Sequence, residues 1–198
     1  MKISSYSAKN GKIKIYADGE ELFTVPAVIW NSSRLKDGDD VSSEELSRLK
    51  AQGDSSAALE SALRMTDLRD HSEYELRQKL LRKYPKEAVD YAISRLLDIG
   101  YLDDEKYALL LAEELYRKKG FAPKRILLEL KNRGIDAEYS ENAINSLDID
   151  TKIGIIKIIE KYGITENSTD KEKNRVIRRL VNMGYSLSDI FRYLNIYE

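Results

Sequence analysis

The sequence predicts a mainly α-helical protein in which tandem three-helix repeats form an elongated, curved array, preceded by a small N-terminal β-hairpin region. One apolar pattern recurs at an offset of 50 residues, with leucines in register at Leu80, Leu130 and Leu180. A period of this length is typical of helical arrays, in which each unit covers its neighbour's apolar face. Such an array presents a long surface that favours binding of an extended partner over catalysis.

The composition predicts charged, soluble helices. Of the 198 residues, 42% are apolar and 34% are charged, with only 10 glycines and 3 prolines, which is unlike a disordered chain. No apolar run approaches the ~20 residues that span a bilayer, and the N-terminus lacks the apolar core of a signal peptide. We therefore expect a cytoplasmic protein without membrane contact.

The first 25 residues predict a small antiparallel sheet. Apolar and basic residues alternate from Lys12 to Ile15, and a second such run follows Asp18-Gly19. Asp-Gly between two strands is a strong hairpin signal, because a type I′ turn needs positive φ at both central positions. Residues 1–6 are expected to add a third strand.

The segment after the hairpin predicts only short helices. Its first part is ambiguous between strand and helix, and we take it as weakly helical. A capping box formed by Ser42 and Glu45 predicts a helix that runs to about Ala51. Residues 53–56, Gly-Asp-Ser-Ser, then predict an interruption, so we expect residues 1–54 to form the N-terminal region.

From Ala57 onward the chain divides into nine helical segments, arranged as three triplets. The boundaries come from capping boxes, from prolines at helix starts and from glycines at helix ends. The three repeats are expected at residues 55–101, 102–148 and 149–198. Their helices are expected at residues 57–68, 72–84, 85–100, 103–119, 123–133, 137–147, 153–162, 169–183 and 186–197.

Basic residues gather on the middle helix of every repeat, although 33 basic and 34 acidic residues give the whole chain a net charge of −1. Four basic residues face two acidic ones in residues 72–84, four face one in 122–133, and five face two in 170–183. If equivalent helices face one side, they form a basic stripe that suits phosphates or an acidic protein surface. The partner-binding candidates are Arg77, Lys79, Arg82, Lys83, Lys124, Arg125, Lys131, Arg133, Arg175, Arg178 and Arg179.

A plainer interpretation of these charges stays open. Cations near the end of a helix are favoured by the helix dipole, so the middle helices could simply carry solvated basic faces. From charge alone, the two interpretations weigh about equally.

The sequence indicates no catalytic, metal or cofactor site. It has no cysteine and one histidine, which excludes disulfides, thiol catalysis and the common zinc clusters. His71 lies in a bend and is expected to be a polar turn residue, while Asp103 and Asp104 are better explained as cap and dipole partners. With no phosphate-binding loop and no activated serine, we expect no enzymatic activity, no cofactor and no small-molecule substrate.

Three motifs resemble the RecX family of recombination regulators. The run R-x-x-S-x-x-E-L occupies Arg69–Leu76, GYLDD at Gly100–Asp104 resembles the family's link between its first two units, and KRI, EL and GI within Lys124–Ile135 resemble the centre of its second unit. The resemblance covers most of the chain and is clearest from residue 69 to 135. One departure is Ala122, where many members have glycine, and another is the nearly neutral overall charge.

This resemblance implies a modulator of the RecA recombinase that acts in recombination, DNA repair and the SOS response. Family members are curved arrays of three-helix units that lodge in the helical groove of the RecA filament on DNA, where they inhibit its ATPase and strand exchange. The implied partner is the RecA filament, and no chemistry by the modulator itself is implied. The residues leave two alternatives open, which are direct DNA binding through the basic middle helices and a general scaffold for another protein.

Overall fold

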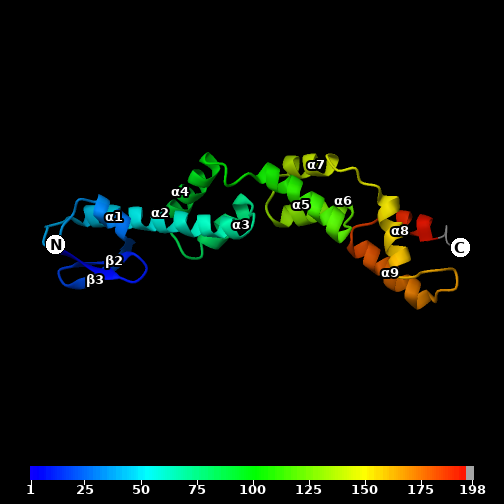
Figure 1. Ribbon diagram of the computed structural model, residues 1–198, viewed down its shortest axis with the longest axis horizontal. Helices are drawn as coiled ribbons and strands as arrows, with labels where there is room; N and C mark the ends of the chain where they lie inside the picture. Colours follow the sequence, from blue (N-terminus) through cyan, green and yellow to red (C-terminus); the bar gives the residue numbers. More distant parts are fainter. Residues whose placement is uncertain (195–198) are drawn as a thin grey trace. The chain divides into compact units, whose positions relative to one another are not determined.

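The computed structural model describes residues 1–194, in which a three-stranded sheet precedes ten helices (Figure 1). The chain forms two compact units, Met1–Leu102 and Asp103–Glu198. The predicted fold class, tandem three-helix repeats behind a small N-terminal sheet, is confirmed. The first unit contains β1 (Ile3–Ala8), β2 (Lys12–Ala17), β3 (Glu20–Pro26), α1 (Ala27–Ser32), α2 (Ser43–Leu68), α3 (Glu73–Leu80) and α4 (Lys86–Asp98).

The second unit contains the second and third helix triplets. The helix expected to begin at Ile153 starts at Thr151, because the Asp150 side chain accepts hydrogen bonds from the Lys152 and Ile153 amides. The last helix was expected to end at residue 197, and its final part lies outside the described residues. The six helices are α5 (Asp104–Lys119), α6 (Pro123–Asn132), α7 (Ala137–Asn145), α8 (Thr151–Lys161), α9 (Asp170–Asn182) and α10 (Leu187–Leu194).

The sheet follows the predicted hairpin. Its strands are antiparallel in the order β1-β2-β3, and the turn residues Asp18 and Gly19 have φ values of 49° and 88°. Positive φ at both positions is what a type I′ turn requires. Ile3, Ile15 and Val25 are almost fully buried and form the centre of the first hydrophobic cluster with α2.

The predicted helix interruption at residues 53–56 is wrong, because α2 is one continuous 26-residue helix. Gly53 is buried, and a Cβ at this position would lie 2.5 Å from Cγ1 of Val25. The glycine therefore permits close contact between α2 and β3 instead of ending the helix. An ion pair of 3.0 Å between Lys50 and Asp54 spans the same turn. The helix crosses the boundary expected after residue 54 and serves both the sheet and the first repeat.

The capping boxes form as the sequence predicts. Ser42 with Glu45, Ser72 with Glu75, and Thr169 with Glu172 each exchange hydrogen bonds between side chain and backbone. These bonds satisfy amides that a helix start leaves unpaired. These local signals therefore determine where α2, α3 and α9 begin, independently of any tertiary contact.

Each repeat closes over its own hydrophobic cluster, with the middle helix at its centre. Leu80, Leu130 and Leu180 are 0% exposed and belong to three different clusters. Phe121, between α5 and α6, packs against the clusters of both the second and the third repeat. Among the described helices, none is both long and apolar enough to cross a membrane.

Replacing Gly53 by alanine is expected to destabilise the sheet region. Alanine gains about 1 kcal/mol of helix propensity over glycine, but overpacking against Val25 costs about 1–3 kcal/mol. The single tryptophan, Trp30, packs against this cluster, so urea unfolding followed by its fluorescence measures the effect. The loss in the unfolding free energy should shrink in a Val25→Ala background, which removes the clashing methyl group.

Gln52→Ala is the matched control, because residue 52 is an exposed neighbour on the same helix. It should leave the unfolding free energy almost unchanged. A stabilising Gly53→Ala would mean that the glycine has no packing role.

Candidate functional site

The predicted binding residues lie on the middle helices or the turns that follow them. In the first repeat, Arg77 and Lys79 lie on α3. In the second, Lys124, Arg125 and Lys131 lie on α6. In the third, Arg175, Arg178 and Arg179 lie on α9. Arg82 and Lys83 lie in the turn after α3, and Arg133 ends α6. The α6 and α9 residues belong to the second unit, and the others belong to the first.

In the first repeat, Arg77 is held by two carboxylates. Its guanidinium donates to Glu73 on the same helix at 2.9 Å and to Asp90 on α4. The pKa of Arg77 is raised, chiefly because Glu73 accepts its hydrogen bond. Arg77 therefore joins α3 to α4, and its charge is largely compensated within the repeat.

Lys79 contacts the only histidine of the chain. Nδ1 of His71 lies 2.9 Å from the carbonyl oxygen of Arg69, and Nε2 lies 2.6 Å from Nζ of Lys79. Since a carbonyl can only accept, Nδ1 carries the proton and Nε2 accepts from the ammonium. His71 is buried, which the prediction of a polar turn residue did not include. Arg82 and Lys83 are exposed and make no ion pair within residues 1–194.

In the second repeat, one carboxylate holds two of the predicted arginines. Glu129 accepts from Arg125 at 2.6 Å and from Arg133 at 2.9 Å. These contacts lower the pKa of Glu129, with the hydrogen bond from Arg133 as the largest cause. Lys124 and Lys131 are exposed and, in the described part of the chain, have no carboxylate partner, so they are the available cations of α6.

The third repeat keeps its charge exposed. Arg175, Arg178 and Arg179 are all exposed, and no described acidic residue forms an ion pair with them. Arg178 donates to the backbone carbonyl of Asn174 at 3.3 Å. The guanidinium of Arg179 lies 5.4 Å from the ring centre of Tyr162, which is the geometry of a cation–π contact.

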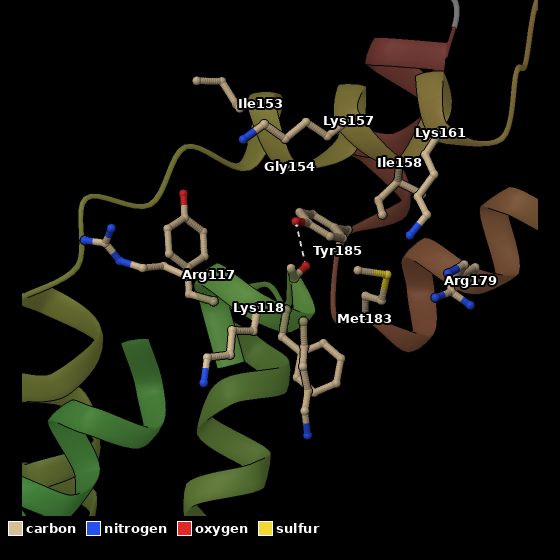
Figure 2. Close-up of a pocket in the computed structure, with 14 residues that line it drawn as sticks. Arg117, Lys118, Ile153, Gly154, Lys157, Ile158, Lys161, Arg179, Met183 and Tyr185 are labelled. Carbon is tan, nitrogen blue, oxygen red and sulfur yellow. Dashed lines mark hydrogen bonds between the residues drawn. The ribbon is translucent and has the colours of Figure 1, made fainter. Parts of the chain in front are cut away.

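Direct contacts hold the second and third repeats together. The amide of Ala122 donates to the carbonyl of Met183 at 2.9 Å, and the hydroxyl of Tyr185 donates to the carbonyl of Gly120 at 3.0 Å (Figure 2). A Cβ on Gly154 would collide with the Tyr185 hydroxyl, so only glycine lets α8 lie against this ring. Burial raises the pKa of Tyr185, and its hydroxyl stays a donor at neutral pH.

A cavity of about 660 Å³ lies at this junction, between the end of α5, α8 and the end of α9 (Figure 2). Six of its lining residues are basic, and no acidic residue of the described chain lines it. A second cavity of about 510 Å³ shares Phe121, Arg179 and Met183 with the first and adds Tyr162. The basic lining residues of the first cavity are Arg117, Lys118, Lys119, Lys157, Lys161 and Arg179.

Of these six cations, the sequence predicts only Arg179 as a binding residue. Arg117, Lys118 and Lys119 end a helix whose start is acidic, and Lys157 and Lys161 lie among the isoleucines of an otherwise largely apolar segment. Two signals were available, the basic triplet before Gly120 and the spacing of four residues between Lys157 and Lys161. Within the described residues, no group of three or more acidic or histidine side chains is arranged to hold a metal ion.

Two family models match consecutive parts of the chain. The model described as the first three-helix domain of RecX matches residues 58–96, and the model of its second three-helix domain matches residues 103–144. Regulatory protein RecX of Salmonella arizonae is 36% identical over 144 residues, which cover 67% of this chain and 86% of the relative. Regulatory protein RecX of Salmonella heidelberg has the same identity and coverage.

Solved structures share the fold. A crystal structure of regulatory protein RecX matches with a TM-score of 0.66 and 19% identity, covering 98% of both chains. RecX from Lactobacillus salivarius matches with a TM-score of 0.58 and 22% identity, covering 73% of this chain and 96% of that one. At these identities the two structures support the fold alone.

The His71 contacts predict a lowered pKa for its ring. Burial is the largest cause, and the charges of Arg69 and Lys79 add to it. The hydrogen bond with the Arg69 carbonyl and the charge of Glu75 oppose the shift. Because the chain has one histidine, a single ring-proton signal reports its titration by NMR. The midpoint should lie below the ordinary value of 6.5, and Lys79→Met should raise it, whereas Arg82→Met, which removes an exposed neighbouring cation, should not.

The same shift has a consequence for stability. When the folded-state pKa is below the unfolded value of 6.5, the unfolded chain binds more protons between the two values. The contribution of His71 to stability is therefore fully present above pH 6.5 and is lost as the pH falls toward the folded pKa. A ring-proton midpoint at or above 6.5 would contradict the buried, neutral assignment.

Proposed function

The chain belongs to the RecX family, and from this premise we propose that it is a regulatory protein that binds RecA filaments on DNA and inhibits their ATPase and recombinase activity. The observation that carries the proposal is the match of RecX models to the first and second repeats in order. The relatives named regulatory protein RecX support a regulatory role at 36% identity. A RecA filament forms on DNA in the bacterial cytoplasm, so this proposal agrees with the predicted cytoplasmic location.

The exposed cations of the middle helices support a binding role over catalysis. A filament of nucleic acid and protein offers phosphates and acidic side chains, which attract such cations over a long surface. We propose that the available cations contact the filament and that the paired ones hold the helices that present them. The available residues, which have no carboxylate or histidine partner in the described chain, are Arg82, Lys83, Lys124, Lys131, Arg175, Arg178 and Arg179. The residues held by a carboxylate or by His71 are Arg77, Lys79, Arg125 and Arg133.

No chemistry by this protein is needed for inhibition. A rigid helical unit bound along the filament can oppose the changes that accompany nucleotide hydrolysis, by binding one conformational state more tightly than another. We therefore propose a non-enzymatic mechanism without cofactor, metal ion or small-molecule substrate.

The decisive experiment is the DNA-dependent ATPase of RecA with the full chain titrated in. The rate of ATP hydrolysis should fall as the concentration rises and should level off once the filament is saturated. Normal hydrolysis with the protein in excess would contradict the proposal. A pulldown that recovers another protein and no RecA would instead favour a general scaffold.

Reversing four available cations should weaken inhibition. The variant Arg82→Glu, Lys83→Glu, Lys124→Glu and Lys131→Glu leaves the ion pairs of Arg77, Arg125 and Arg133 intact. Since an exposed charge contact contributes roughly 0.2–1 kcal/mol, the four changes together should raise the half-inhibitory concentration about tenfold or more. The ATPase titration measures this, with circular dichroism as the check on folding.

A control of equal charge separates a specific surface from net charge. Lys9, Lys36, Lys86 and Lys152 are exposed and lie outside the middle helices and both cavities. Their simultaneous replacement by glutamate should change the half-inhibitory concentration much less. Equal losses in the two variants would show that the middle helices are only solvated surface.

A further inference from the structure

The cavity between the second and third repeats gathers six basic side chains from three helices. Lys119, Lys157 and Lys161 line it without a carboxylate partner among the described residues. Lys157 and Lys161 are four residues apart on α8, where like charges repel and weaken a helix. Both side chains are exposed, so a ligand with several negative charges can reach them and compensate both charges at once.

The remaining cations of the cavity are readily available. Arg117 and Lys118 pair with Glu113 and Glu114 at 2.8 and 3.5 Å, but all four side chains are at least 47% exposed. Such exposed pairs contribute little and can be exchanged for a stronger anion. The second cavity extends the positive lining through Arg175 and Arg178.

Aromatic side chains lie beside these cations. Phe121 lines both cavities and has the Arg125 guanidinium 5.4 Å from its ring centre, while Tyr162 lines the second cavity beside Arg179. Sites for single-stranded nucleic acid combine a basic groove that follows the backbone with aromatic rings on which unpaired bases stack. In a duplex the base faces are covered, so these rings would have no base to stack on.

The walls of the two cavities are fixed by the contacts between the repeats. Tyr185 is hydrogen-bonded to Gly120, and the Ala122 amide is hydrogen-bonded to Met183. Figure 2 shows Tyr185 between α8 and the end of α5, with Lys157 and Lys161 extending from α8. A site held open in advance loses less conformational freedom when a ligand binds.

We propose that the two cavities form one groove that binds the sugar–phosphate backbone of a single-stranded nucleic acid, with Phe121 and Tyr162 facing its bases. The groove binds the strand in the free protein, so this inference goes beyond the proposed inhibition of RecA. Five of the six cations around the first cavity lie outside the middle helices.

Fluorescence anisotropy of a labelled oligothymidylate, measured with the full chain and without RecA, tests the proposal. Affinity should fall steeply from about 50 to 200 mM salt, because each neutralised phosphate contributes about −0.7 to the logarithmic slope for a single strand. The variant Lys118→Glu, Lys157→Glu and Arg179→Glu should weaken binding at least about tenfold and make the slope shallower by about 2.

A matched control changes one exposed lysine on each of the same three helices. Lys106, Lys152 and Lys171 lie in the first turns of α5, α8 and α9 and line neither cavity. Their triple replacement by glutamate alters the net charge equally and should change affinity less than about twofold. If the reversed groove variant unfolds, the glutamine version of the same three positions replaces it and should still weaken binding.

Four outcomes would overturn the proposal. These are no binding by the native protein, equal losses in groove and control variants, equal or tighter binding of a duplex of the same sequence, and displacement of the strand by polyglutamate at equal charge concentration. The last would identify the groove as a site for an acidic protein segment. The strand-binding experiment contains no RecA, so none of these outcomes decides whether the protein inhibits the RecA ATPase. Equally, a failure to inhibit the ATPase would not decide whether the groove binds a single strand.

Discussion

The structure depends on one repeated contact, the burial of two apolar residues four positions apart on each middle helix. Leu76 and Leu80 do this in the first repeat, and both are 0% exposed. Val176 and Leu180 do the same in the third repeat at 2% or less. Because residues four apart share a helix face, this pair determines which face is inside and leaves the basic residues outside. The position of the basic surface is therefore a consequence of how the core closes.

Repeats with the same core use their charges differently. In α6, Glu129 lies between Arg125 and Arg133 and forms an ion pair with each. In α9, no described carboxylate pairs with Arg175 or Arg178. A single acidic residue in one repeat thus converts two candidate binding residues into structural ones. Counting basic residues on equivalent helices therefore overestimates the number of cations in the second repeat that are available to a partner.

Local signals in the sequence predict most of the fold, and tertiary contacts explain the rest. The hairpin turn at Asp18 and the capping box at Ser72 depend on residues within a few positions, so the sequence displays them directly. The position of Gly53 inside a helix has a different cause, which is its contact with Val25 on a strand that precedes the helix. No residue near Gly53 in the sequence indicates that contact. The groove likewise depends on Tyr185 meeting Gly120 across 65 positions. Cations of α5 and α8 appear unrelated until that contact brings them together.

The glycines at the junctions show where the relative placement of neighbouring elements is encoded. At Gly53 the missing Cβ lets α2 lie against β3, and at Gly154 it lets α8 lie against the ring of Tyr185. In both places the neighbour is a side chain from another layer. An added Cβ would lie only 2.5 Å from Cγ1 of Val25 or 2.1 Å from the Tyr185 hydroxyl oxygen, so the neighbouring side chain or the helix would have to move. At the junction between the second and third repeats the contact residues also belong to the core, because Ala122, Met183 and Tyr185 are members of the third repeat's hydrophobic cluster. The spacing of the two repeats and the packing of the third are therefore set together. The position of the third repeat, and with it the width of the basic groove, therefore depends on contacts such as Gly154 against Tyr185 and Ala122 against Met183, in addition to the repeated leucines.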